Sequence, residues 1–365
     1  MGATAGYMGQ IDIMLLVCVS LCGCFGLGNT RLYEDQLGYS RALGDAEKSD
    51  TLLNVVRLRY ADAPIILQAT QVISGYQLQR NVTGGFEVFP TEHPNTFVSG
   101  SASAQLQQSP TFTFQPLSGA QFAESFVRPL SPAELLPLAN GGLPIDVLFR
   151  LCVQSINGLS NAVALTQVGA AGSPDFFLLL RDLRRLQIAG VLSIRLQRNA
   201  APTGTHRDSD PGHVYFYLAT TRDPDLLAAV EQAKRLLGMP SGVSEAEVVY
   251  GYSRAPGQVA LLSRSMLGVL AQLSLQIEVP PDDVARHRTL PTVGNIGLEH
   301  RPVVIIRSGA VAPADVFTSV QYRRTWFWIA EDDFDSKLAF TIVQILLALS
   351  RTENAPGAIV TIPAG

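Results

Sequence analysis

The stretch HVYFYLATTRDPDLLAAVEQAKRLL, residues 213–237, decides the fold class because a strand pattern and a helix pattern follow each other within it. Residues 213–220 are rich in aromatic and branched side chains, which favours a β-strand. The Asp-Pro-Asp at 223–225 then opens a helix, with an N-cap aspartate and a proline in the first turn. The sequence therefore predicts a domain that mixes strands with helices.

Outside this stretch the mixture continues without a regular order. Residues 316–322 and 325–329 form a hairpin about Arg323 and Arg324, with no helix between them. Because strict strand–helix–strand alternation is missing, we expect an α+β fold: an antiparallel or mixed sheet with helices packed on one face, preceded by a β-hairpin-rich segment. Further strands are predicted at 191–198, 248–253, 303–307 and 358–362, helices at 119–127, 131–139, 143–156, 173–189 and 336–350, and a short strand running into a helix at 259–277.

The β-hairpin-rich segment follows an amphipathic helix that is predicted over residues 45–60. Thr, Ser, Gln, Val and Phe then alternate up to residue 115, between Gly and Pro residues. Residues 98–108 are rich in small residues and uncharged. Three interpretations remain open: an ordinary sheet face, a flexible arm that packs on a neighbour, or a hairpin contributed to a multi-chain barrel. The strands are predicted near 65–81, 85–90, 96–107 and 111–115.

Composition limits the classes of partner. Hydrophobic residues make up 47% of the 365 residues and charged residues only 16%, well below the usual quarter. A chain so poor in charge is expected to bury surface against a partner or against itself. The net charge of −4 and the scattered Lys and Arg argue against a nucleic-acid partner.

The N-terminal stretch MLLVCVSLCGCFGLGN, residues 14–29, is apolar and about as long as the hydrophobic region of a secretory signal. Leu21 and Gly23 before Cys24 resemble the lipobox of bacterial lipoproteins. This resemblance implies signal cleavage between Gly23 and Cys24, lipidation of Cys24, and a membrane as partner through that lipid. A buried helix and a cleaved signal without lipid are the alternatives.

This resemblance also divides the chain and places it in the cell. Residues 1–23 are the expected signal peptide, 24–44 a lipidated tether, 45–117 a helix plus the β-hairpin-rich region, and 118–365 an α+β domain. Phe25 stands where an aspartate would favour retention in the inner membrane. We therefore expect an outer-membrane lipoprotein that faces the periplasm.

One local cluster is a candidate for chemistry. It begins with Trp326 and Trp328 on a strand and continues with four carboxylates at the start of a helix: Glu331, Asp332, Asp333 and Asp335. The sequence favours helix capping, because acids in a first turn satisfy its free N–H groups and its dipole. A partner-binding patch is the second interpretation, and a metal or catalytic site is the third.

Other candidates are weaker. No catalytic residue, metal ligand or cofactor is predicted, since the five histidines are scattered and no nucleophile elbow is present. Cys152, the one cysteine left beyond residue 24, is expected to be a small core residue. Residues 263–265, Ser-Arg-Ser, form a weak candidate for an anion site at a helix start.

Three phrases resemble segments of a family of bacterial envelope lipoproteins without an assigned activity: residues 54–60, 155–159 and 332–337. This resemblance implies an envelope location and adds no mechanism. We therefore expect a non-catalytic structural or interaction module, within an oligomer or with other envelope proteins. The alternatives are a hydrolase or metal-dependent enzyme that uses residues 331–335, and a subunit of an oligomeric export pore.

Overall fold

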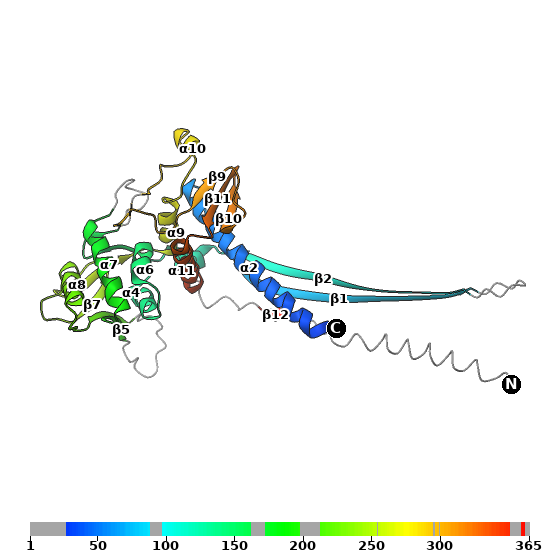
Figure 1. The fold of residues 1–365 in the computed structure, drawn as a ribbon, viewed down its shortest axis with the longest axis horizontal. Helices are drawn as coiled ribbons and strands as arrows, with labels where there is room; N and C mark the ends of the chain where they lie inside the picture. The colour runs from blue at the N-terminus through cyan, green and yellow to red at the C-terminus, as the bar shows by residue number, and fades with distance from the viewer. Residues whose placement is uncertain are drawn as a thin grey trace, which may run out of the picture.

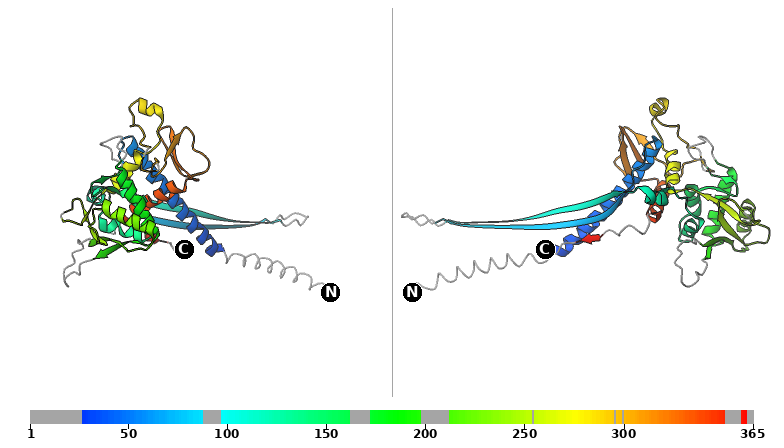
Figure 2. Two further views of the ribbon diagram at one scale, coloured as in Figure 1. Left: turned by 60° about the vertical axis from the view of Figure 1, so that its left-hand side comes forward. Right: turned by 180° about the vertical axis from the view of Figure 1, so that it is seen from behind.

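The computed structural model describes residues 27–87, 97–161, 172–197, 212–253, 255–294, 296–298, 300–350 and 359–361 (Figure 1). The expected signal peptide, with Gly23, and the expected lipidation site, Cys24, lie outside these residues. The described part confirms the predicted α+β class. It consists of a compact body and one long arm that projects from it (Figures 1 and 2).

The body is built around a six-stranded mixed sheet in the order β4-β3-β8-β7-β6-β5. Neighbouring strands are antiparallel except β7 and β8, which are parallel. In β6, Val214, Phe216 and Leu218 are buried and the positions between them are more exposed, as the two-residue period of a strand requires. The strands are β3 (Val153–Ile156), β4 (Leu159–Ser160), β5 (Leu192–Gln197), β6 (His213–Leu218), β7 (Glu245–Tyr250) and β8 (Val259–Ser263).

Most of the longer helices of the body begin at side-chain caps that the sequence contains. Ser173 accepts a hydrogen bond from the N–H of Phe176, Asp223 accepts from Asp225 and Leu226, and Ser265 caps α9. The longer helices are α6 (Ile145–Cys152), which has no side-chain cap, α7 (Pro174–Ile188), α8 (Pro224–Leu236), α9 (Met266–Ser274) and α11 (Phe334–Ser350). Short turns are α3 (Gly119–Phe122), the π-helix η1 (Ala123–Val127), α4 (Pro132–Leu135), α5 (Pro137–Asn140) and α10 (Pro281–Ala285).

A smaller antiparallel sheet, in the order β10-β11-β9, lies beside the long helix α2 (Figure 1). Its strands are β9 (Arg307–Gly309), β10 (Val316–Tyr322) and β11 (Thr325–Ala330), and α2 spans Leu27–Arg59. Leu52, Val55 and Val56 of α2 are fully buried and belong to the same hydrophobic cluster as the helices of the body. The last turns of α2 are therefore part of the body, although they precede the arm in sequence.

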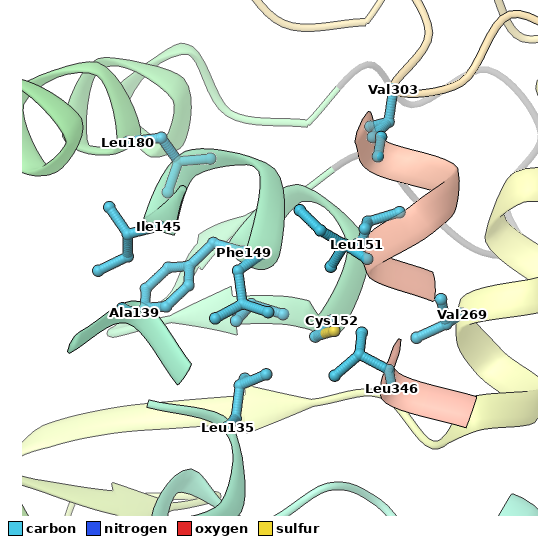
Figure 3. Packing of buried hydrophobic residues seen from close by; sticks show 14 of the residues in the cluster. Leu135, Ala139, Ile145, Phe149, Leu151, Cys152, Leu180, Val269, Val303 and Leu346 are labelled. Carbon is cyan, nitrogen blue, oxygen red and sulfur yellow. The ribbon is translucent and has the colours of Figure 1, made fainter. Parts of the chain in front are cut away.

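The core of the body lies where α6, α9 and α11 meet. Figure 3 shows Cys152 there, near Leu151, Val269 and Leu346. The Cys152 thiol is free and fully buried, as the sequence predicts. Burial raises the pKa of the Cys152 thiol to about 12, although nearby Arg264 acts in the opposite direction. This thiol is inert at neutral pH.

The arm is a single hairpin of two long strands, β1 (Leu67–Glu87) and β2 (Phe97–Pro116). Their antiparallel register runs from the Leu67↔Pro116 pair near the body to the Glu87↔Phe97 pair at the far end, with one bulge after Ala69. A short strand, β12 (Ile359–Thr361), pairs in parallel with β1 at Gln71–Ile73. The arm and the N-terminal end of α2 project from the same side of the body (Figures 1 and 2).

Several predicted boundaries were wrong. The four strands expected near 65–81, 85–90, 96–107 and 111–115 are two long ones, so Gly84-Gly85 and Pro110 do not turn the chain. The expected helix over 143–156 ends at Cys152, where the chain enters β3. The helix expected to begin at residue 45 begins at Leu27, so most of the expected tether is helical. Among the described helices, none combines the length and the apolar character needed to cross a membrane.

Candidate functional site

The tryptophans of the sequence cluster lie on the outer face of the β10-β11-β9 sheet. Phe327 and Ile329 of β11 are fully buried, whereas Trp326 and Trp328 on the alternate face are half-buried. Gly309 on β9 lies against Trp328: a Cβ atom there would come within 3.1 Å of its ring. The half-buried tryptophan face is consistent with the second interpretation, a partner-binding patch.

Asp333 is the N-cap of α11. Its carboxylate accepts hydrogen bonds from the backbone N–H of Ser336 at 3.2 Å and from the Ser336 hydroxyl at 2.7 Å. The Ser336 side chain is fully buried, and its oxygen also accepts from the N–H of Ile305 at 2.9 Å. Asp333 and Ser336 therefore join the start of α11 to the chain segment before β9.

Arg301 binds two carboxylates of the cluster. Its guanidinium lies 3.1 and 3.3 Å from the two oxygens of Asp333 and 3.1 Å from Asp335. Burial raises the pKa of the Asp333 carboxyl, but the hydrogen bonds from Ser336 and Arg301 together outweigh burial and lower it below its usual value. Asp333 is therefore ionised at neutral pH and paired.

The remaining acids of the cluster do not converge on one point. Glu331 is paired with Lys337, whose ammonium also donates to the Glu331 carbonyl oxygen at 3.0 Å, and Asp332 is exposed. In the part of the chain that the structure describes, no three His, Cys, Asp or Glu residues are placed to hold a metal ion. This geometry fits the capping interpretation and gives the catalytic one no support.

The residues that carry the resemblance to the lipoprotein family make structural clamps. Asn54 donates from its amide to the carbonyl of Ile65 at 2.9 Å and accepts from the N–H of Ile65 at 2.8 Å, which fastens the start of the arm to α2. Asn157 and Gly158 have φ angles of 46° and 80° and turn the chain between β3 and β4. Asn157 also accepts from the N–H of Ala260 at 2.7 Å. Asn54 and Asn157, in the segments 54–60 and 155–159, therefore have structural roles within the protein and are not needed to explain a surface activity.

The side chains of the Ser-Arg-Ser segment at 263–265, the candidate anion site, already form hydrogen bonds within the protein. The Ser263 hydroxyl donates to the carbonyl of Leu130, and Ser265 caps α9. The buried guanidinium of Arg264 donates to backbone carbonyls of α6 and β3, and burial lowers its pKa to about 10. This segment therefore connects elements inside the body and does not present donors to an anion.

A cleft that the sequence analysis missed lies between α6, α7 and the segment 296–298. It has a volume of about 330 Å³, and the described residues that line it include four arginines and one carboxylate. The relevant signal was the spacing of Phe177, Arg181, Arg184 and Arg185, which places them on one face of a helix. That Arg150 of α6 joins them depends on helix packing, which no local pattern reveals. The lining arginines are Arg150, Arg181, Arg184 and Arg185.

Comparison of the chain with models of known protein families, with curated proteins and with solved structures gave no match.

Proposed function

We propose that this chain is a non-catalytic envelope lipoprotein, held at the outer membrane by lipid on Cys24, that assembles with other copies through its β1–β2 arm. The observation that carries this proposal is the arm itself. It is a two-stranded ribbon of 21 and 20 residues. An isolated two-stranded hairpin is at best marginally stable in water, so a ribbon of this length requires a further partner.

The edges of the arm offer the means of association. Among the described residues, β1 has a second partner only at Gln71–Ile73, where β12 pairs with it, and β2 has none besides β1. Long unpaired strand edges present rows of free N–H and C=O groups to another chain. Pairing of the β2 edge of one copy with the β1 edge of the next would satisfy both rows and continue the sheet. A second copy is the favoured partner because its strands have the same length.

The alternation of residues along the arm gives it two different faces. Beyond the bulge, one face contains the apolar positions Val72, Leu78, Val82 and Phe86 of β1, with cross-strand partners such as Leu106 and Ala102. The same face also contains one charged position, Arg80, opposite Ala104. The other face contains Gln77, Gln79, Asn81 and Thr83, paired with Gln107, Gln105, Ser103 and Ser101. One mostly apolar face and one mostly polar face suit a sheet that separates an apolar environment from water.

The direction of the arm agrees with a membrane location. Cys24 comes just before Leu27, the first residue of α2, and the arm projects from the same side of the body as that end of α2 (Figures 1 and 2). At about 3.3 Å per residue the arm is roughly 70 Å long. The hydrocarbon layer of a bilayer is only about 30 Å thick. The arm could therefore reach the membrane that holds the lipid and extend into it.

A closed ring of such hairpins is the second candidate function, since it would form an export pore. The two-faced pattern of the arm favours it, because strands that span a bilayer place apolar residues toward lipid and polar residues toward water. The enzyme alternative has no comparable support, because Asp333, Asp335 and Glu331 are engaged by Arg301 and Lys337.

The test compares two lysine pairs at alternate positions of β1. Leu78→Lys with Val82→Lys adds two positive charges to the mostly apolar face, on both sides of Arg80. The matched control, Gln79→Lys with Asn81→Lys, adds the same charge to the polar face. We expect the first pair to abolish the assembly that is extracted with mild detergent and the control to retain it, as measured by native mass. Equal masses for both variants would contradict the proposal.

Two further readouts separate the parts of the proposal. Cys24→Ala should move the protein from the membrane fraction to the soluble fraction if lipid is the anchor. In planar bilayers, a pore would conduct ions and the Gln79→Lys/Asn81→Lys control would shift its selectivity toward anions. An assembly that conducts no ions would eliminate the pore and leave the structural module.

A further inference from the structure

A positively charged cleft lies on the body, next to the segment that contains Arg301: Arg150, which lines the cleft, donates a hydrogen bond to the Arg301 carbonyl at 2.8 Å. Arg181, Arg184 and Arg185 project from one face of α7, and Arg150 joins them from α6. The chain as a whole has a net charge of −4. A local excess of positive charge on an acidic protein attracts an anion.

The charged groups of the cleft are only partly compensated by the protein. Arg184 lies 3.6 Å from Asp146 and donates to the side-chain oxygen of Gln187 at 2.8 Å. Arg181 lies 3.4 Å from Asp182, at the limit of a hydrogen bond, and half of its side chain is exposed. Arg185 is exposed, and within the described part of the chain no carboxylate forms an ion pair with it. Arg181 and Arg185 therefore have donors that can turn toward a ligand.

The floor of the cleft is apolar. Phe177 and Leu180 of α7 and Ile296 of the opposite segment are buried and line it. Gly297, at φ 75°, packs directly on the Phe177 ring: a Cβ atom there would lie 3.1 and 3.2 Å from two ring carbons. Only glycine allows the segment to approach so closely, and this contact holds one wall of the cleft against α7.

We infer that this cleft binds an organic phosphate, with its phosphate between Arg181 and Arg185 and its apolar part over Phe177 and Leu180. A phosphate group offers three acceptor oxygens, and guanidinium groups bind such oxygens in pairs. A volume of about 330 Å³ is far larger than one inorganic phosphate and is at the lower end of pockets for small organic ligands. This site is independent of the proposed assembly through the arm.

The test measures binding of phenyl phosphate to the full-length, lipid-bearing protein in mild detergent by isothermal titration calorimetry. We expect saturable binding with one site per chain. The variant Arg181→Gln/Arg185→Gln should weaken it by about tenfold or more, because hydrogen bonds to charged groups contribute strongly to affinity. The matched control Arg222→Gln/Arg235→Gln removes the same charge from other exposed positions around α8 and should bind like the unchanged protein.

Two further probes define the ligand. Phenol carries the ring without the phosphate and should not bind. Dihexanoyl phosphatidic acid represents a lipid headgroup, and glycerol 3-phosphate represents a soluble phosphate ester. The compound that binds with the higher affinity identifies the class of the natural ligand. Binding of phenol as tight as that of phenyl phosphate, equal weakening by both arginine pairs, or no binding of any phosphate would overturn the inference. The inference also requires that the unchanged protein binds phenyl phosphate. It can therefore be rejected even if the arginine variants are too unstable to measure.

Discussion

The body and the arm are held together by different means. In the body, strands are covered by helices, a continuous hydrophobic cluster extends from α2 to α11, and buried polar side chains such as Ser336 bind the backbone of distant segments. In the arm, two strands pair with each other over their whole length, and among the described residues only β12 adds to them. From this comparison we expect that the body folds as a monomer, whereas the arm needs a surface beyond the described residues.

Removal of a large core side chain should show this difference most clearly. Phe149 of α6 is fully buried, and Phe149→Ala should reduce the free energy of unfolding by about 3–5 kcal/mol. Leu78→Ala in the arm should leave unfolding of the body unchanged. Both tryptophans of the chain lie in β11, so their fluorescence during urea denaturation reports on the body. A similar loss of stability in both variants would show that arm and body unfold as one unit.

The cap of α11 gives the next largest effect. Asp333→Ala removes an N-cap and a partner of Arg301, and should cost about 2 kcal/mol at neutral pH. Asp333→Asn retains the cap and loses the charge, so its cost should be smaller.

The same variants have a defined pH dependence. The pKa of Asp333 is lowered in the folded protein, so its carboxylate stabilises the fold above the unfolded pKa of about 4. That contribution is lost as the pH falls through the folded pKa. Urea denaturation at several pH values should show the gap between Asp333→Ala and the unchanged protein closing in acid. A gap of constant size would show that the charge of Asp333 contributes nothing.

The turn clamp at Asn157 should give a smaller effect. Asn157→Ala removes the hydrogen bond to Ala260 and leaves alanine at a φ of 46°, with an expected cost of about 1–2 kcal/mol in urea denaturation. Asn157→Gly relieves the backbone and lacks the same hydrogen bond, so it separates the two contributions. If glycine restores full stability, the side-chain clamp has no role.

Asp332 should show the smallest effect of all. It is exposed beside the cap, and we expect Asp332→Asn to leave the urea midpoint and the assembly unchanged. A loss of assembly in this variant, with stability intact, would support the interpretation of the tryptophan and carboxylate cluster as a partner-binding patch.

Local signals predicted much of the body, and long-range contacts decided the rest. The helices α7 and α8 begin at Ser173 and Asp223 because those caps act within one turn. Residues 153–156 continue an apolar helical pattern, yet they form β3 because β8 lies alongside to pair with them. The arm was divided into four strands because Gly and Pro favour turns, but a register of twenty paired positions carries the chain through them.

For the candidate sites too, the sequence predicted the local contacts and not the long-range ones. The capping role of Asp333 is local and could be predicted from the sequence, whereas its pairing with Arg301 depends on a segment far away in the chain. The arginine cleft needs two helices and Gly297 to meet, so only the folded chain shows it.

The most direct test of the central claim is the native mass of the full-length, lipid-bearing protein in mild detergent, beside a variant that lacks residues 75–109. Ser74 and Pro110 are paired in the register, so a short glycine linker can close the shortened hairpin. The account predicts a defined multimer for the full-length protein and a monomer for the variant, with the same tryptophan-reported unfolding of the body. If the two proteins contain the same number of copies per assembly, whether one or several, the account is contradicted.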